Sequence, residues 1–136
     1  MPIDHIGLGV PDVDAAREYY DELLPMLGFV REWEVGYRAV DWYGAQLFLY
    51  PTLEDGDYSR HRVGLQHLSF YVPTRADVHR IHDWATARGH EIVHEPRVFP
   101  EYSPLFYATF FLDQHGFMLE AVTYEDPDAS AAAPES

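Results

Sequence analysis

The chain has 136 residues, the length of one ordinary domain, and its composition of 47% hydrophobic and 15% aromatic residues excludes a disordered chain. It contains no cysteine, which excludes disulfides, thiolate metal sites and a cysteine nucleophile. The formal net charge of −14 argues against nucleic acids and anionic membranes as partners, because both require a basic surface, and it permits a cationic ligand.

The first residues, Met1 to His5, contain no basic segment followed by an apolar stretch, and so do not have the pattern of a signal peptide. No apolar run approaches the roughly 20 residues that a membrane helix needs. We therefore expect a cytoplasmic protein.

The first predicted element is a strand at residues 4–11, Asp-His-Ile-Gly-Leu-Gly-Val-Pro. Apolar residues alternate along it, so Ile6, Leu8 and Val10 are predicted to face the core and His5 the opposite side. A helix follows, with Asp12 or Asp14 as its N-cap and Gly28 as its stop. Its apolar positions recur at helical spacing: Ala16, Tyr20, Leu23, Leu24 and Leu27.

Three strands are predicted to complete the first half, at Phe29–Val35, Tyr37–Trp42 and Ala45–Tyr50. The first half thus has the order β-α-β-β-β.

The second half repeats this order, which is the main observation from the sequence. Residues 66–73, Gln-His-Leu-Ser-Phe-Tyr-Val-Pro, match the first strand, and His67 stands where His5 stands. Alternation places His67, Ser69 and Tyr71 on the side away from the core. The next helix is predicted to begin at Thr74, with Asp77 completing a capping box, and to end at Gly89.

Strands are then expected at Glu91–Arg97, Phe106–Leu112 and Phe117–Thr123, and the second half is longer by an irregular loop at Val98–Leu105. We predict an α+β domain at residues 1–124, built from two tandem βαβββ modules at about 1–52 and 64–124 that form a curved mixed sheet. Residues 125–136 are small, acidic and Pro-containing, and are predicted to be a disordered tail.

The repeat predicts a metal site. His5, His67 and Glu120 would all lie on the helix-free side, and would converge if the two sheets curl into one concave surface. Glu120 stands in an apolar strand, where a bound cation would remove the cost of burying a carboxylate. Two imidazoles and one carboxylate suit Fe(II) first, and could also hold Zn, Mn or Ni. The position equivalent to Glu120 is Phe48, which leaves open coordination positions, as catalysis needs.

Aromatic and apolar residues are expected beside the three ligands. The candidate pocket consists of Phe48, Tyr50, Met118, Arg97 and Tyr102, and Tyr71 shares its face. Two interpretations stay open for the aromatic side chains: a pocket for an aromatic or otherwise apolar substrate, or the filling of a barrel or dimer interface. Arg38 and Arg97 could bind a substrate carboxylate or form surface ion pairs. The histidines at 79, 82, 90, 94 and 115 are assigned structural, surface or turn roles.

Three motifs carry a resemblance to a known family. They are Asp4-His5-Ile6-Gly7-Leu8, Gln66-His67-Leu68-Ser69-Phe70, and the segment from Asp113 to Glu120, in which Gln114 stands where the family usually has proline. These motifs and the duplication resemble the vicinal oxygen chelate superfamily over about residues 3 to 124. The superfamily contains glyoxalase I, extradiol dioxygenases, fosfomycin-resistance enzymes and bleomycin-resistance binding proteins.

The resemblance implies a metal-dependent enzyme whose substrate binds a divalent ion through two neighbouring oxygens. Glyoxalase I enzymes usually have a fourth ligand, a glutamate, where this chain has Phe48. Extradiol dioxygenases use two histidines and one glutamate together with acid–base residues, for which Tyr107 and Tyr71 are the tyrosine candidates.

Two other functions stay open. The acidic charge and the aromatic face also fit a non-catalytic bleomycin-resistance-type protein that sequesters a bulky cationic or aromatic ligand. A metal-free structural or regulatory module is the third hypothesis. The resemblance further implies a homodimer as one assembly, with modules paired within a chain or exchanged between chains.

Overall fold

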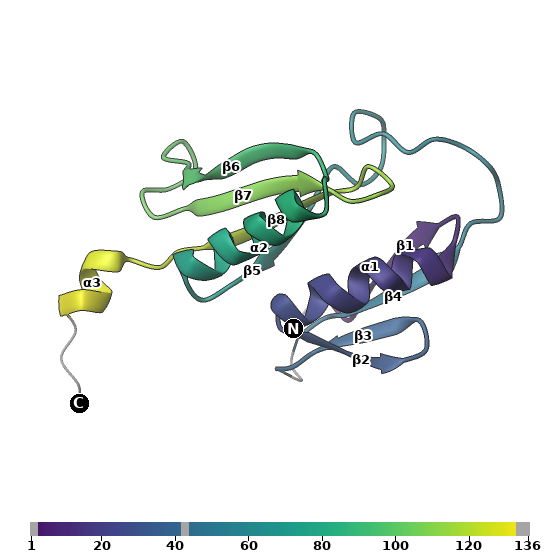
Figure 1. Cartoon of the computed structure of the whole chain (residues 1–136), viewed down its shortest axis with the longest axis horizontal. Helices are drawn as coiled ribbons and strands as arrows, with labels where there is room; N and C mark the ends of the chain where they lie inside the picture. The colour runs from purple at the N-terminus through teal and green to yellow at the C-terminus, as the bar shows by residue number, and fades with distance from the viewer. Residues whose placement is uncertain (1–2, 42–43, 133–136) are drawn as a thin grey trace. The chain divides into compact units, whose positions relative to one another are not determined.

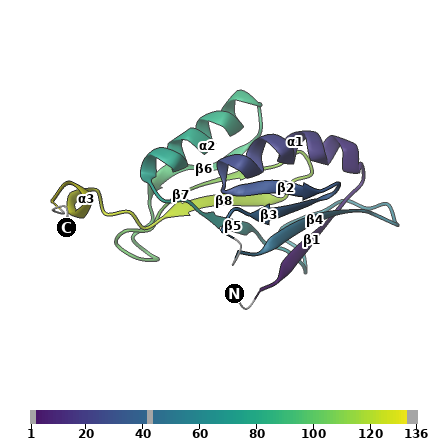
Figure 2. The same cartoon turned by 90° about the horizontal axis from the view of Figure 1, so that it is seen from below.

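The computed structural model of the protein describes residues 3–41 and 44–132. The chain divides into two compact units, Met1–Asp57 and Tyr58–Ser136. Each unit contains one four-stranded sheet with a helix packed on one of its faces (Figures 1 and 2). The predicted α+β fold of two tandem βαβββ modules is confirmed, and the strands pair as two sheets, one in each module.

The first unit consists of β1 (His5–Val10), α1 (Val13–Met26), β2 (Phe29–Trp33), β3 (Gly36–Ala39) and β4 (Gln46–Pro51). Its sheet has the order β1-β4-β3-β2, in which β1 runs parallel to β4 and the other pairs are antiparallel. The predicted third strand extended to Trp42, but β3 ends at Ala39, and residues 42–43 lie outside the described residues.

The second unit repeats this order with β5 (Leu68–Tyr71), α2 (Arg75–Ala87), β6 (Ile92–Val98), β7 (Tyr107–Leu112) and β8 (Met118–Thr123). Its sheet has the order β5-β8-β7-β6, and β5 runs parallel to β8. The helix packs against β6, β7 and β8. β8 therefore lies between two neighbouring strands and under a helix, and all six of its residues are buried.

The structure differs from the sequence prediction in the C-terminal tail, where Pro127–Ala132 form a short helix, α3. The Asp126 carboxylate accepts a hydrogen bond of 3.0 Å from the backbone N–H of Asp128, as an N-cap does. Proline at the first helical position and the alanines that follow favour a helical turn. Residues 133–136 lie outside the described residues. No helix of the described part of the chain is long and apolar enough to cross a membrane.

The beginnings of both main helices follow the prediction. Asp12 caps α1 by accepting a hydrogen bond of 3.1 Å from the N–H of Ala15, which decides between Asp12 and Asp14. Thr74 and Asp77 form the predicted capping box of α2, because each side chain accepts a hydrogen bond from the other residue's N–H.

The capping box leads to a prediction about pH. The hydrogen bond from Arg80, together with those from Thr74, lowers the pKa of Asp77 below its ordinary value of 3.8. Asp77→Ala should therefore destabilise the protein at neutral pH, and this loss should shrink as the pH falls through the lowered pKa, because the protonated parent loses the same contribution. Thr74→Ala should cost about 1 kcal/mol at neutral pH and should keep part of that cost at acidic pH, because the bond from the Asp77 N–H to the Thr74 hydroxyl does not depend on the carboxylate. Urea unfolding at pH 7 and near pH 3 measures both; an Asp77→Ala deficit that stays constant would contradict the assignment.

The core of the first unit lies between α1 and its sheet. Tyr19, Tyr20, Leu23 and Leu24 are fully buried on the helix, as are Leu49 and Tyr37 on the strands. The Tyr37 hydroxyl donates a hydrogen bond of 2.8 Å to the Asp21 carboxylate, and burial together with this bond raises the pKa of Tyr37. Burial removes water from this hydroxyl, and the hydrogen bond to Asp21 replaces the lost water contacts.

Removing this hydroxyl should destabilise the fold. Tyr37→Phe is expected to lower the free energy of unfolding by about 1 to 2 kcal/mol, the range for a hydrogen bond to a charged group that is partly exposed. Tyr71→Phe is the matched control, because the Tyr71 side chain is 63% exposed. Equal midpoints of urea unfolding for the two variants would contradict the importance of the Tyr37–Asp21 bond.

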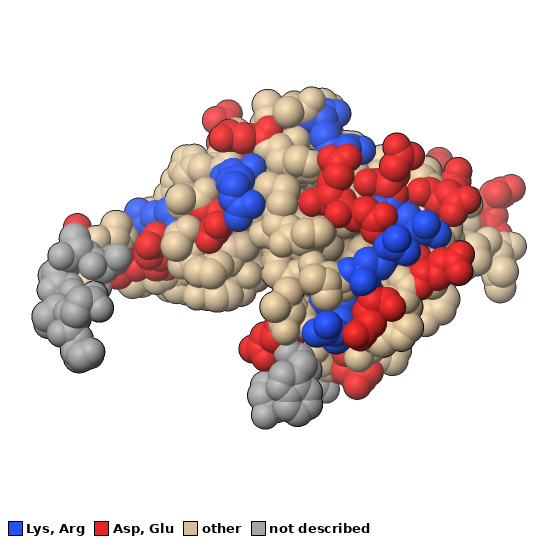
Figure 3. Space-filling view, turned by 60° about the horizontal axis from the view of Figure 1, so that its bottom comes forward, with Lys and Arg blue, Asp and Glu red and all other residues tan. Residues whose placement is uncertain are grey.

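Charged side chains are interleaved on the surface (Figure 3). Arg38 pairs with Glu32 at 2.9 Å and Arg31 with Asp21 at 3.3 Å. Of the two predicted alternatives for Arg38, the structure shows the surface ion pair.

Candidate functional site

Glu120 is the centre of the candidate site. It lies in the middle of β8 with 3% of its surface exposed, and its register partner on β5 is Ser69. The Nε2 atom of His67 lies 3.2 Å from Glu120 Oε1. Burial raises the pKa of Glu120, and hydrogen bonds from Ser69 and His67 oppose this shift. The other oxygen, Oε2, is buried and has no hydrogen-bond partner among the described residues.

The imidazole of His67 is held by its own neighbour in the chain. Its Nδ1 atom bonds to the side-chain oxygen of Gln66, and its ring packs against Phe110 with centroids 5.8 Å apart. These contacts direct Nε2 toward the carboxylate of Glu120. A histidine whose Nδ1 is engaged by a hydrogen bond presents Nε2 as its ligating atom.

The same arrangement occurs in the first unit. His5 Nδ1 lies 2.6 Å from Asp4 Oδ1, and the ring stands edge-on to Phe48 at a centroid distance of 5.6 Å. Each of the two histidines is thus oriented by the residue that precedes it in the repeat. Because Nδ1 is engaged in this way, the neutral imidazole of His5 has its lone pair on Nε2.

The structure brings together two of the three predicted metal ligands, His67 and Glu120, within the second unit. His5 belongs to the first unit, and the described residues contain no group of three or more His, Asp or Glu side chains that could hold a metal ion. The trio therefore stays a prediction. The pair fits a divalent cation chemically, because a buried carboxylate with one unpartnered oxygen lies beside an imidazole nitrogen.

A pocket of about 670 Å³ opens on the helix-free face of the second sheet, and both His67 and Glu120 line it. Its other polar lining residues are Gln66, Ser69, His94 and Ser103. Its apolar and aromatic lining consists of Phe99, Tyr102, Phe106, Phe110, Met118, Val122 and Tyr124. An apolar pocket with a few polar groups on its wall is typical of sites for small molecules.

The structure separates the predicted pocket residues into two groups. Met118 and Tyr102 line the pocket of the second unit. Phe48 and Tyr50 lie on the first sheet, where the Phe48 ring contacts the rings of His5 and Tyr50. Arg97 stands outside the pocket lining: its guanidinium lies 3.7 Å from the ring centroid of Phe99, and it donates a hydrogen bond to the carbonyl of Val98.

The tyrosines predicted as acid–base residues lie elsewhere. Tyr107 is on the face of the sheet that α2 covers, with its hydroxyl 2.6 Å from His79 Nε2 and the Arg75 guanidinium 4.5 Å from its ring centroid. Phe110, three positions along β7, points to the opposite face and lines the pocket. Tyr71 is exposed and is not a lining residue. The geometry therefore argues against an acid–base role for Tyr107 beside Glu120.

Ser69 and His94 are among the pocket residues that were not predicted as functional. Ser69 had been placed on the same side as His67 by strand alternation, and this was the signal that could have identified it. His94 lines the pocket with its ring edge-on to Phe99 and Phe110, although a structural role was expected. Register shifts in β6 on both sides of His94 interrupt the alternation, so the sequence carried no clear signal there.

Comparison with known proteins identifies relatives along nearly the whole chain. A protein-family model described as the Glyoxalase/Bleomycin resistance protein/Dioxygenase superfamily matches residues 2–128. The uncharacterized protein YqjT of Bacillus subtilis (strain 168) is 30% identical over 99 residues, which cover 68% of this chain and 76% of YqjT.

Solved structures share the fold. A glyoxylase/bleomycin resistance protein/dioxygenase domain from Frankia sp. EAN1pec matches with a TM-score of 0.72 and 21% identity over 96% of both chains. Lactoylglutathione lyase from Agrobacterium tumefaciens matches with a TM-score of 0.61 and 22% identity, over 89% of this chain and 92% of that one. At these identities the likeness shows the fold alone.

Proposed function

Because the chain belongs to the Glyoxalase/Bleomycin resistance protein/Dioxygenase superfamily, we propose that it is an enzyme that acts on a small substrate with the help of a divalent metal ion. The observation that carries this proposal is the buried carboxylate of Glu120, which faces His67 with one oxygen and leaves the other unpartnered among the described residues. A buried carboxylate without full pairing is costly, and a bound cation would remove that cost.

Two ligands come from the second unit, His67 and Glu120, and the sequence repeat predicts His5 as the third. Members of the superfamily typically bind divalent metals. Fe(II) is the first choice for two imidazoles and one carboxylate, with Zn, Ni or Mn as alternatives. When bound, the ion would act as a Lewis acid toward two neighbouring oxygens of the substrate.

The remaining residues of the site orient the ligands and receive the substrate. Gln66 and Asp4 form hydrogen bonds with the Nδ1 atoms of the two histidines, so that Nε2 is the atom of each ring that would bind the metal ion. Ser69 bonds to the Glu120 carboxylate from the neighbouring strand. The aromatic side chains form the apolar part of the pocket lining, which would receive the substrate.

The aromatic lining also supports a second candidate, a non-catalytic protein that sequesters a bulky cationic or aromatic ligand. Such a protein would bind its ligand without a metal ion. The net charge of −14 fits a cationic ligand in particular.

Metal content separates the two candidates. The protein, purified anaerobically without a metal-binding tag, is expected to hold about one equivalent of metal and to melt at a higher temperature with the ion than after chelation. His67→Ala and Glu120→Gln should lose most of this metal, because each removes one ligand. His79→Ala is the control, since His79 pairs with Tyr107 on the other face of the sheet and should leave metal content unchanged.

The identity of the ion directs the next assay. Iron that is lost in both ligand variants would favour a dioxygenase, tested by oxygen uptake. Zinc, nickel or manganese in the same pattern would favour a glyoxalase-type lyase or isomerase. A parent protein that neither contains metal nor takes it up on reconstitution would overturn the proposal and leave the binding protein as the better interpretation.

A further inference from the structure

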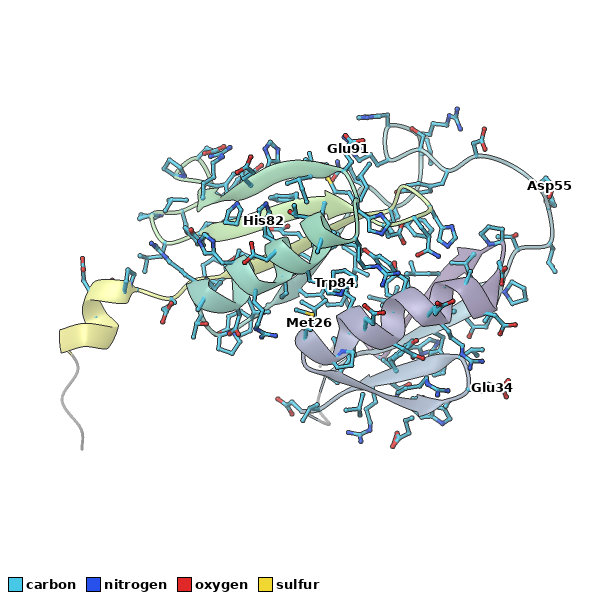
Figure 4. The ribbon with its side chains drawn as sticks, in the orientation of Figure 1. Met26, Glu34, Asp55, His82, Trp84 and Glu91 are labelled. Carbon is cyan, nitrogen blue, oxygen red and sulfur yellow. The ribbon has the colours of Figure 1, made fainter. Side chains whose placement is uncertain are left out.

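The two modules differ most in one loop. In the first unit, β2 and β3 are joined by a short turn that contains Glu34 (Figure 4). In the second unit, the equivalent strands β6 and β7 are joined by residues 99–106. Three aromatic residues of this loop, Phe99, Tyr102 and Phe106, line the pocket that contains Glu120. The added residues of the second module are thus part of the wall of the candidate site.

Hydrogen bonds within the backbone close this loop on itself. The N–H of Phe99 donates to the carbonyl of Phe106 at 2.8 Å, and the N–H of Tyr102 donates to the carbonyl of Phe99 at 3.0 Å. A third bond of 3.3 Å joins the N–H of Phe106 to the carbonyl of Ser103. A loop with its own hydrogen bonds holds its side chains in place before a ligand arrives.

The three rings pack against one another. Tyr102 stacks on Phe99 with an interplanar angle of 18° and centroids 6.0 Å apart, and it meets Phe106 edge-on at 5.1 Å. Phe99 is almost completely buried, and its ring also contacts Phe110 of β7 at 5.5 Å. Tyr102, by contrast, has 64% of its surface exposed. The loop therefore presents one accessible ring that is supported by buried ones.

The chemistry of the lining distinguishes this wall from the part of the pocket that contains His67 and Glu120. Glu120 is the one carboxylate among the described lining residues, and no arginine lines the pocket. Around the loop the lining offers ring faces and edges together with His94 and Ser103. Ring faces and edges favour flat aromatic groups over aliphatic groups of similar size, since aromatic pairs gain free energy beyond the area that they bury.

We propose that the loop of residues 99–106 determines substrate specificity by selecting molecules with a flat, uncharged aromatic body. The body packs on Tyr102 and the rings beneath it. The role of this wall in catalysis rests on the proposed function, because the polar end of the substrate would face His67 and Glu120. Binding of the aromatic body itself does not require the metal.

The test uses the neutral fluorescent probe N-phenyl-1-naphthylamine with metal-free protein. The probe should bind the parent, and 2-naphthol should displace it at a lower concentration than decahydro-2-naphthol, which has the same carbon skeleton without the flat rings. Tyr102→Ala should weaken probe binding about three- to tenfold, the factor that corresponds to one aromatic contact. Tyr102→Phe should restore binding. Leu53→Ala is the control, because Leu53 is 96% exposed and belongs to the first unit, outside the pocket lining.

Several results would overturn the inference: no probe binding by the parent, equal displacement by the flat and the saturated alcohol, or equal effects of Tyr102→Ala and Leu53→Ala. Circular dichroism of each variant checks that the fold is intact. Metal content, measured on the same samples, separates this inference from the proposed function. A Tyr102→Ala protein that keeps its metal and binds the probe like the parent contradicts the loop alone. A parent that neither contains metal nor takes it up on reconstitution, but still discriminates the two alcohols, contradicts the metal-dependent enzyme alone.

Discussion

The burial of one carboxylate is the constraint on which the second unit depends. Glu120 lies in the middle of a strand that α2 covers on one face, and on the other face its neighbours Met118, Val122 and Phe110 are apolar. A carboxylate in such a place must be bonded, protonated or bound to a cation. Ser69 of β5 and His67, which directly precedes that strand, supply part of what it needs, and β5 pairs with β8 in parallel register. The same pairing that completes the sheet therefore also builds the polar end of the pocket.

The first module has no carboxylate at the position equivalent to Glu120. Phe48 occupies the position that corresponds to Glu120, and its register partner on β1 is Gly7, where the second module has Ser69. A side chain at Gly7 would collide with the ring of Tyr50, so glycine there leaves room for that ring. One module thus carries a histidine among aromatic rings, and the other carries a histidine beside an acid. The duplicated plan has become a pair of unlike halves.

The sequence predicted what depends on local pattern. Strand alternation placed His67 on the helix-free face, and capping preferences placed the start of α2 at Thr74, because these features are decided by neighbouring residues in the chain. The sequence prediction failed where the strand register decides which face of the sheet a side chain occupies. Tyr107 was expected in the site but faces α2, and His94 was missed because the bulges of β6 interrupt its alternation. The position of Tyr102 on the pocket wall was predicted, whereas the hydrogen bonds that hold its loop were not.

Each of the two histidines is oriented by the residue immediately before it, Asp4 in one module and Gln66 in the other. An orienting partner that is adjacent in the chain needs no help from distant parts of the fold, so the setting of the imidazole is inherited together with the strand that bears it. Gene duplication, fusion or the exchange of a module between chains would therefore transfer a histidine whose imidazole is already oriented by its neighbour. Evolution could then alter the acid, the opposing aromatic ring or the connecting loop in one copy while the donor in the other stays ready for use.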